Sequence, residues 1–253
     1  MSTPYLPGKF VWLEFLTQDI DKAVSFYDGL FGWRTARVPT GGGTPYPMIH
    51  NGDQAIGGYR KGPPGAKSHW VSYLSVPDVD ASHRAAVAAG CRIMLAPTNF
   101  SPFGRAAAMA DPTGASFCLW KGTNGDPPDV EKTPMGAWFW NELWTSNDRK
   151  ALAFYATMFG FTHDEMSMGP MTYHVLKSGG RPRAGLCQSV NPGAKSMWLP
   201  YVAVPDCDAT ARKAAALGGE VVTPPRDMPG IGRFGIAVDT AGAAVAFITP
   251  TSS

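Results

Sequence analysis

Two glutamates, Glu14 and Glu142, are the best candidates for chemistry in this sequence. Each lies two residues after a tryptophan, Trp12 or Trp140, in a short apolar run that is typical of a β-strand. Because side chains alternate along a strand, the carboxylate and the indole of each pair should share one face. A carboxylate in an aromatic, apolar cavity has its charged form disfavoured, which predicts a general base. The alternative is a structural carboxylate that binds backbone amides or an arginine.

Two tyrosines form the second candidate pair. A weak internal repeat of the sequence matches Tyr73 to Glu14 and Tyr201 to Glu142. A glutamate and a tyrosine that face one cavity suit proton transfer, or hydrogen bonding to a carbonyl or a phenol. The alternative is that these tyrosines fill the interior and have their hydroxyl groups satisfied there.

Two arginines, Arg105 and Arg233, each follow a glycine at the start of a predicted strand. A guanidinium at such a position is able to clamp a carboxylate or the oxygens of a diketone in a bound substrate. The alternative is a local salt bridge, to Asp111 for the first arginine and to Asp239 for the second.

A stronger internal duplication relates these candidates to one another. When the 253-residue chain is aligned with itself without a gap, Phe26-Tyr27 falls on Phe154-Tyr155, and many other positions match in the same register. A repeat that spans half of such a chain is a folded domain rather than a solenoid unit. We therefore predict a first domain over 1–122 (copy one), a linker over 123–134 and a second domain over 135–253 (copy two).

The elements that must position the candidates have the same order twice within each copy. A strand is followed by a helix, and glycine- and proline-rich turns then separate three further strands. The sequence therefore predicts an α+β fold of four βαβββ modules. In copy one the expected strands are 10–17, 33–38, 46–50, 55–60, 69–76, 91–95, 105–109 and 116–120, and the expected helices begin near Asp19 and Asp78.

Composition excludes several classes of partner. Lys and Arg total 22 against 20 for Asp and Glu, and the net charge of +2 predicts neither nucleic-acid nor membrane binding. The four cysteines form no C-x-x-C pair, which favours free thiols in a reducing compartment. No apolar stretch has the length of a membrane span or follows a basic segment at the N-terminus. We expect a cytoplasmic protein that is a monomer or a homodimer.

Three motifs carry a family resemblance. They are the helix motif of Ala23-Val24-x-Phe26-Tyr27 followed by Leu30-Phe31-Gly32-Trp33, the middle-strand motif of residues 76–80, and the closing turn of residues 111–115. With these motifs the sequence resembles the vicinal oxygen chelate superfamily, which includes glyoxalases, bleomycin-resistance proteins and extradiol dioxygenases. The resemblance implies two half-barrel pockets, one for each pair of modules. It specifies the fold strongly and the reaction weakly.

Enzymes of that superfamily hold a divalent metal with His and Glu side chains. The resemblance assigns aromatic, aliphatic or thiol residues to those positions, and a metal site needs three or four N, O or S ligands. We therefore expect no metal cofactor, and we expect most of these positions to line a substrate pocket. The positions are Trp12, Val71 and Cys118 in copy one, and Trp140, Leu199 and Ala246 in copy two.

Histidines give no symmetric centre, because none of the five falls on another histidine in the ungapped alignment of the two copies. That alignment places His174 of copy two on Tyr46 of copy one. His174 is therefore a candidate substrate-binding residue, or one ligand of an asymmetric metal centre together with a cysteine or a glutamate.

Three functions fit these features. The first is binding of a small oxygenated or aromatic metabolite, transformed by metal-independent acid–base chemistry of the lyase, isomerase or hydrolase type. The second is sequestration of a drug or toxin without catalysis, as bleomycin-resistance proteins do. The least favoured is a metal-dependent glyoxalase I or dioxygenase. The sequence leaves open whether one copy or both copies are functional.

Overall fold

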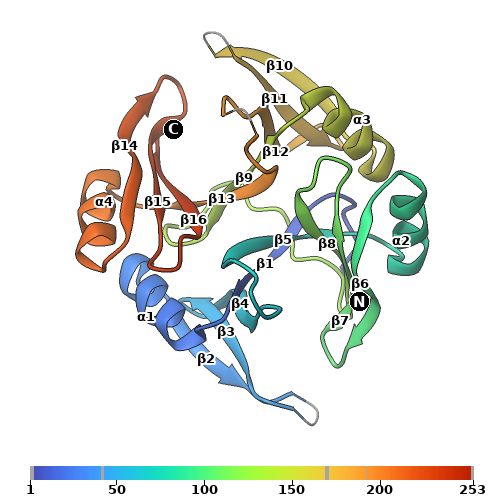
Figure 1. The fold of residues 1–253 in the computed structure, drawn as a ribbon, viewed down its shortest axis with the longest axis horizontal. Coiled ribbons are helices and arrows are strands. Elements are labelled where there is room, and N and C mark those ends of the chain that lie inside the picture. The colour runs from blue at the N-terminus through green and yellow to red at the C-terminus, as the bar shows by residue number, and fades with distance from the viewer. Residues whose placement is uncertain (1–2, 41–42, 169–170, 192, 252–253) are drawn as a thin grey trace. The chain divides into compact units, whose positions relative to one another are not determined.

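Each copy of the repeat forms one curled, eight-stranded sheet with two helices (Figure 1). The computed structural model describes residues 3–40, 43–168, 171–191 and 193–251. The strand order is β2-β3-β4-β1-β5-β8-β7-β6 in the first sheet and β10-β11-β12-β9-β13-β16-β15-β14 in the second. The two orders are equivalent position by position. The predicted α+β fold of tandem domains is confirmed.

The elements of copy one follow the predicted module order. They are β1 (Phe10–Thr17), α1 (Ile20–Phe31), β2 (Arg34–Val38), β3 (Tyr46–Asn51), β4 (Gln54–Lys61), β5 (His69–Ser75), α2 (Val79–Ala88), β6 (Arg92–Phe100), β7 (Gly104–Ala110) and β8 (Ser116–Gly122).

Copy two repeats this order. Its elements are β9 (Trp138–Thr145), α3 (Asp148–Phe159), β10 (Thr162–Met168), β11 (Met171–Ser178), β12 (Arg181–Gln188), β13 (Met197–Ala203), α4 (Cys207–Ala216), β14 (Glu220–Met228), β15 (Gly232–Val238) and β16 (Ala244–Pro250). In the part of the chain that the structure describes, none of the helices has the length and apolar character of a membrane span.

Local capping fixes the ends of the first helix in each copy. The Asp19 side chain accepts a hydrogen bond from the Lys22 backbone N–H at 3.0 Å, and α1 ends at Gly32, whose φ is 74°. In copy two, Asn147 caps α3 and Gly160 ends it with a φ of 65°. The left-handed conformation strongly favours glycine, so the sequence determines where both helices stop.

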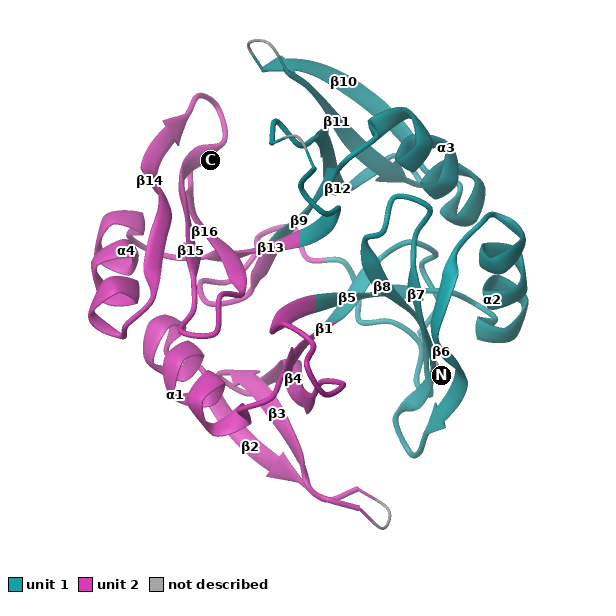
Figure 2. Ribbon diagram, viewed as in Figure 1, with its two compact units in different colours: residues 1–12, 71–129, 140–198 teal, residues 13–70, 130–139, 199–253 magenta. Residues whose placement is uncertain are grey.

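The chain separates into two compact units, and each unit takes one half of either copy (Figure 2). Unit 1 comprises residues 1–12, 71–129 and 140–198. Unit 2 comprises residues 13–70, 130–139 and 199–253. Sequence-adjacent modules of one copy therefore belong to different units, and each unit pairs a module of copy one with a module of copy two.

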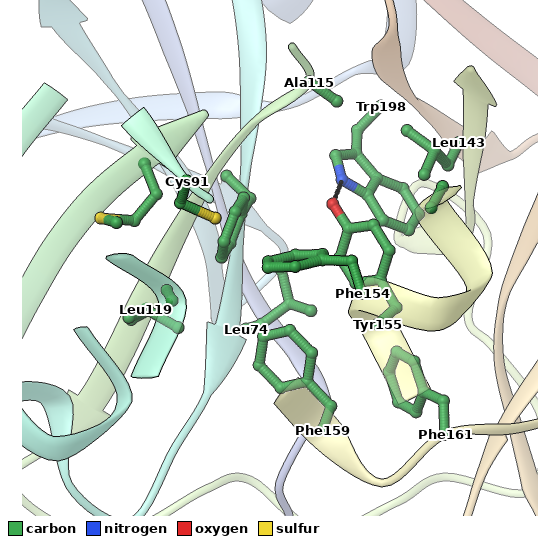
Figure 3. Packing of buried hydrophobic residues seen from close by; sticks show 14 of the residues in the cluster. Leu74, Cys91, Ala115, Leu119, Leu143, Phe154, Tyr155, Phe159, Phe161 and Trp198 are labelled. Carbon is green, nitrogen blue, oxygen red and sulfur yellow. Dashed lines mark hydrogen bonds between the residues drawn. The ribbon is translucent and has the colours of Figure 1, made fainter. Parts of the chain in front are cut away.

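Each unit has its own aromatic core. In unit 1, Phe154, Tyr155 and Phe159 of α3 lie in one buried cluster (Figure 3). Phe117 of β8 packs edge to face on Phe154 and Tyr155, with ring centroids 5.9 Å and 6.1 Å apart. In unit 2, Phe15 of β1 packs in the same way on Tyr27 of α1 at 5.1 Å. Such rings remove large apolar areas from water, and they dominate the burial energy of each unit.

One buried polar contact in unit 1 joins the two copies. The Tyr155 hydroxyl donates to the Asp111 carboxylate at 3.0 Å and accepts from the Trp198 indole at 3.0 Å. The other carboxylate oxygen of Asp111 accepts from the backbone N–H groups of Thr113 and Ala115. Burial, and then the charge of Asp111, raise the pKa of Tyr155 well above its ordinary value, so the tyrosine remains a donor.

Unit 2 contains the equivalent contact with the roles of the copies exchanged. The Tyr27 hydroxyl of copy one donates to Asp239 of copy two at 3.2 Å and accepts from Trp70 at 3.1 Å. Inside each unit, the helix motif of one copy therefore contacts the closing turn of the other copy. These are two of the motifs that carried the family resemblance.

Removing either tyrosine hydroxyl should destabilise the protein. In Tyr155→Phe or Tyr27→Phe a buried carboxylate loses a donor, and we expect the free energy of unfolding to fall by about 1–3 kcal/mol. Urea unfolding followed by circular dichroism measures this change. Tyr5→Phe is the control, because the Tyr5 hydroxyl donates to a backbone carbonyl at a partly exposed site and its loss should cost less. Equal losses of stability in all three variants would show that the buried Tyr–Asp hydrogen bonds contribute no more than the hydrogen bond of Tyr5.

An ion-pair cluster in unit 1 fixes the segment that follows copy one. Asp129 contacts the Arg183 guanidinium of β12 at 2.6 Å and 3.0 Å, and the Lys9 ammonium at 3.1 Å. Hydrogen bonding from Arg183, followed by that from Lys9, lowers the pKa of Asp129 to about 2. This carboxylate therefore connects the segment after β8 to residues of both copies.

The Asp129 cluster should make stability depend on pH in acid. The folded-state pKa of about 2 lies below the value of roughly 3.9 for an unfolded chain, so the stabilisation is complete above the unfolded value. It should be lost as the pH falls from about 4 towards 2. We expect Asp129→Asn to be less stable than the parent at pH 6, with the difference shrinking below pH 4. Guanidinium unfolding across pH 2.5–6 tests this, and a constant difference would refute it.

Candidate functional site

Glu14 lies in unit 2 with a tyrosine and an arginine on its carboxylate. Strand β1 pairs in parallel with β4, and Glu14 is opposite Gly58. The Tyr46 hydroxyl donates to Oε1 at 3.0 Å, and Arg60 Nε donates to Oε2 at 2.9 Å. Only 3% of Glu14 is exposed, so the ion pair and the hydrogen bond hold a buried carboxylate. This geometry matches the arginine-paired, structural interpretation of Glu14.

Glu142 lies in unit 1, where a chain of donors leads to its carboxylate. The Trp140 indole donates to the Tyr173 hydroxyl at 2.9 Å, and Tyr173 in turn hydrogen-bonds Glu142. The Trp144 indole also donates to Glu142 Oε1. Burial, followed by the charge of Glu142, raises the pKa of Tyr173 far above its ordinary range. Tyr173 therefore stays protonated and remains a donor.

The two glutamate sites differ in charge at one equivalent position. Strand β4 places Arg60 opposite Leu16, and strand β12 places Cys187 opposite Trp144. Cys187 therefore occupies the position in copy two that Arg60 occupies in copy one. Burial and the nearby Glu142 raise the pKa of the Cys187 thiol to about 12, so this residue is neutral. A cation in copy one is thus replaced by an uncharged thiol in copy two.

The structural counterpart of Tyr46 is Tyr173, and not His174 as the ungapped alignment predicts. Val38 pairs with Tyr46, and Met166 pairs with Tyr173, so the connection from β10 to β11 is one residue shorter than that from β2 to β3. A shift of one residue moves a side chain to the opposite face of a sheet. His174 therefore faces α3, away from Glu142.

Two glycines make room for the tyrosines. A Cβ at Gly58 would lie 2.1 Å from the Tyr46 hydroxyl oxygen, and a Cβ at Gly185 would lie 1.8 Å from that of Tyr173. Neither approach is compatible with a side chain larger than hydrogen. The Glu–Tyr–Gly arrangement is therefore common to both copies, although the shorter hairpin moves the tyrosine and the glycine of copy two one position earlier in the sequence.

Alanine at either glycine should displace the tyrosine from its glutamate. For Gly185→Ala and Gly58→Ala we expect a loss of about 1–3 kcal/mol in the free energy of unfolding, because the added methyl overpacks a filled site. Gly62→Ala is the matched control, since its Cβ would have no neighbour nearer than 3.4 Å. Urea unfolding measures all three. A control as unstable as the other two variants would show that the tyrosine contact is not the cause.

Tyr73 and Tyr201 remain predictions as site residues. Tyr73 lies on β5 in unit 1, buried against the edge of the Trp120 ring at 5.8 Å. Tyr201 lies on β13 in unit 2, with its ring 6.3 Å from that of Phe234. Each tyrosine belongs to a different unit from the glutamate that the weak repeat matches to it.

Arg105 and Arg233 each bind the first turn of a helix. Arg105 Nε and Nη2 donate to the two oxygens of Asp80 on α2, both at 2.8 Å. Arg233 makes the same bidentate contact with Asp208 on α4, at 2.8 Å and 2.9 Å. The arginines hold the pKa of Asp80 and Asp208 below the usual range through these hydrogen bonds.

The prediction that Arg105 and Arg233 form salt bridges with Asp111 and Asp239 is therefore wrong. Both carboxylates accept from the backbone of their own turn and from a tyrosine. Arg105 also lines an open hollow of about 580 Å³ with Asn99 and Lys121. Substrate binding by the two arginines stays a prediction.

The sequence belongs to a known superfamily. The model of the Glyoxalase/Bleomycin resistance protein/Dioxygenase superfamily matches residues 9–119 and 140–247. The chain is 36% identical over 252 residues to the Putative glyoxylase CFP32 of Mycobacterium bovis, covering 97% of this chain and 96% of the relative. It is 30% identical over 243 residues to the Anthracycline biosynthesis protein DnrV of Streptomyces peucetius, covering 90% and 88%. The chain is therefore a member of this superfamily.

Solved structures with the same fold include a Mn(II)-bound glyoxalase and a dioxygenase. The Mn(II)-bound glyoxalase of Novosphingobium aromaticivorans aligns with a TM-score of 0.64 and 16% identity, covering 96% of this chain and 82% of that one. The 2,2',3-trihydroxybiphenyl 1,2-dioxygenase of Sphingomonas wittichii gives a TM-score of 0.68 and 14% identity, covering 96% and 90%. At these identities the likeness concerns the fold.

The positions that the resemblance assigns to metal ligands do not fit a metal in this chain. In copy one, Trp12, Val71 and Cys118 offer a single thiol among them, and Val71 and Cys118 are buried. In copy two, Leu199 and Ala246 are buried hydrocarbon, and the Trp140 indole donates to a tyrosine. Zn²⁺, Mn²⁺ or Fe²⁺ needs several N, O or S donors at one point.

Proposed function

We propose that the protein binds a small, planar, oxygen-bearing organic molecule, and that copy two acts on it by acid–base chemistry with Glu142 as the base. The observation that carries the proposal is the replacement of Arg60 by Cys187 beside an otherwise repeated Glu–Tyr–Gly arrangement. The duplication keeps the carboxylate and the tyrosine in both copies and changes the charge next to them.

In copy one, Arg60 occupies one oxygen of Glu14 and Tyr46 occupies the other. A substrate would have to displace the Arg60 guanidinium before it could transfer a proton to this carboxylate. A partly buried, hydrogen-bonded ion pair is costly to break from one side, because the remaining charge loses its partner. Copy one is therefore better suited to bracing the sheet, or to binding a ligand without chemistry.

In copy two, Tyr173, Trp144 and Cys187 lie near the Glu142 carboxylate, and all three are neutral groups. Tyr173 and Trp144 donate to Glu142 and fix its orientation, and Cys187 stays an uncharged thiol. An oriented carboxylate in an aromatic setting suits the abstraction of a proton on carbon beside a carbonyl, or of a phenolic proton. Returning that proton at a neighbouring atom completes an isomerisation, which needs no other reactant.

The relatives support this class of ligand. One relative is named as a glyoxylase, and another is named for anthracycline biosynthesis. Dicarbonyl compounds and anthracyclines both carry oxygens on a planar or conjugated skeleton. The indole of Trp140 beside the Glu142–Tyr173 pair suits stacking against such a skeleton.

Sequestration without chemistry is the second candidate. The superfamily includes bleomycin-resistance proteins, and the aromatic residues at the former ligand positions favour ligand binding in general. In this case both copies would bind, and Glu142 would act as a hydrogen-bond acceptor for a ligand hydroxyl group.

Glutamine variants in the two copies distinguish these functions. A thermal-shift screen of hydroxyaromatic and dicarbonyl compounds identifies a ligand, and proton exchange from it into D₂O is then followed by NMR. We expect Glu142→Gln to retain ligand binding and to slow exchange by a factor of at least about 100. Glu14→Gln, the matched control, should slow exchange less than about tenfold.

Exchange that survives in Glu142→Gln would refute the base assignment. Tight binding by the parent with no exchange or turnover would favour sequestration.

A further inference from the structure

Three side chains with metal-ligating atoms meet on one face of the β10–β11 hairpin in unit 1. Glu165 of β10 is directly opposite His174 of β11 in the antiparallel register, and His163 lies two residues before Glu165. Directly opposed residues, and residues two apart on one strand, share a face. The ligand atoms of the three side chains all lie within 4.8 Å of one another.

His174 is the unusual member of this group. It is 4% exposed, and neither ring nitrogen has a hydrogen-bond partner among the residues that the structure describes. A buried polar group without a partner costs stability, and such groups in native proteins commonly mark a bound ion or water. The His174 imidazole is therefore placed to bind an ion or a water molecule.

The surroundings of His174 give its two nitrogens different roles. Nδ1 is 3.7 Å from Glu165 Oε1, and His163 Nε2 is also 3.7 Å from Glu165 Oε1. The other nitrogen, Nε2, has Asp148 Oδ2 of α3 at 3.8 Å. Ligating histidines typically donate their second N–H to a carboxylate, which fixes the tautomer and strengthens the ligand.

We propose that His163, Glu165 and His174 form a site for a divalent transition-metal ion, with Zn²⁺ as the favoured occupant. His174 binds through Nδ1, and Asp148 accepts from its Nε2–H. Ligand atoms around a tetrahedral Zn²⁺ lie roughly 3.4 Å apart, given bond lengths near 2.0–2.1 Å. Two of the distances are therefore only a few tenths of an ångström too long. Small side-chain rotations of His163 and Glu165, which are both exposed, would close the site.

The ligand chemistry selects the class of metal. Two imidazoles and one carboxylate suit Zn²⁺, Co²⁺, Ni²⁺ or Cu²⁺, whereas Mg²⁺ and Ca²⁺ prefer sites made of oxygen atoms. Three protein ligands leave a fourth position for water on the exposed side of His163 and Glu165. The site lies on the face covered by α3, whereas Tyr173 and Glu142 belong to the opposite face. It is therefore distinct from the proposed acid–base site and does not depend on it.

Copy one serves as an internal control for this assignment. The same hairpin register in β2 and β3 places Thr35, Arg37 and Pro47 at the positions of His163, Glu165 and His174. None of these offers a ligand of the same kind, and Thr35 donates instead to the Asp28 carboxylate. The fold alone does not require metal-binding side chains here, so their presence in copy two is specific to that copy.

Zinc binding by the full-length, untagged protein tests the proposal. After dialysis against a chelator, isothermal titration with Zn²⁺ should give one equivalent per chain, with a dissociation constant below about 10 µM at pH 7.5. His163→Ala and Glu165→Gln change exposed side chains and should leave the fold intact. Each should weaken binding at least about tenfold, and Asp148→Asn should weaken it by a similar factor.

Controls separate this site from adventitious binding. His69→Ala removes a half-exposed histidine elsewhere and should leave Zn²⁺ affinity unchanged. Co²⁺ should give a visible d–d absorption band that His163→Ala removes. The proposal is overturned if the parent binds no Zn²⁺, or if His163→Ala and Glu165→Gln bind as tightly as the parent. It is also overturned if His69→Ala weakens binding as much as they do.

Discussion

A tyrosine hydroxyl bound to a carboxylate of the other repeat copy is the contact on which both units depend. Tyr155 satisfies Asp111 in unit 1, and Tyr27 satisfies Asp239 in unit 2. The two carboxylate residues are only 4% and 5% exposed, so each one requires a donor from across the unit. In each closing turn one carboxylate oxygen accepts from the backbone of its own turn, and the other accepts from the tyrosine of the other copy.

The sequence was sufficient for the fold and only partly sufficient for the candidate site. The repeat and its turn residues predicted the order of strands and helices in the four modules, because hydrophobic alternation and helix caps act locally. Glu14 and Glu142 were also found, but Tyr46, Arg60 and Tyr173 were missed as their partners. Those contacts depend on which strands pair, and one shorter hairpin shifts the register by a residue. The glycines against which the tyrosines pack were the available signal for that shift.

The two copies show which parts of the fold tolerate change. The interior of each unit keeps the same tyrosine–tryptophan–aspartate contact, because its loss would leave a buried carboxylate without one of its donors. The strand positions next to the glutamates differ in charge, as Arg60 and Cys187 show. The hairpin face under the helix differs as well, as Thr35 and His163 show. The shared framework therefore leaves two places where one copy can acquire a property that the other lacks.

The exchange of modules between units also determines when the protein can fold during synthesis. Unit 2 combines residues 13–70 with residues 199–253, so the first module leaves the ribosome long before its core partner is made. At about 5–20 residues per second, the segment between these two stretches takes roughly 6–26 s to synthesise. During that interval the apolar face of α1, which includes Phe26 and Tyr27, lacks the α4 module. The nascent chain should therefore engage chaperones through its N-terminal module until the last strands appear.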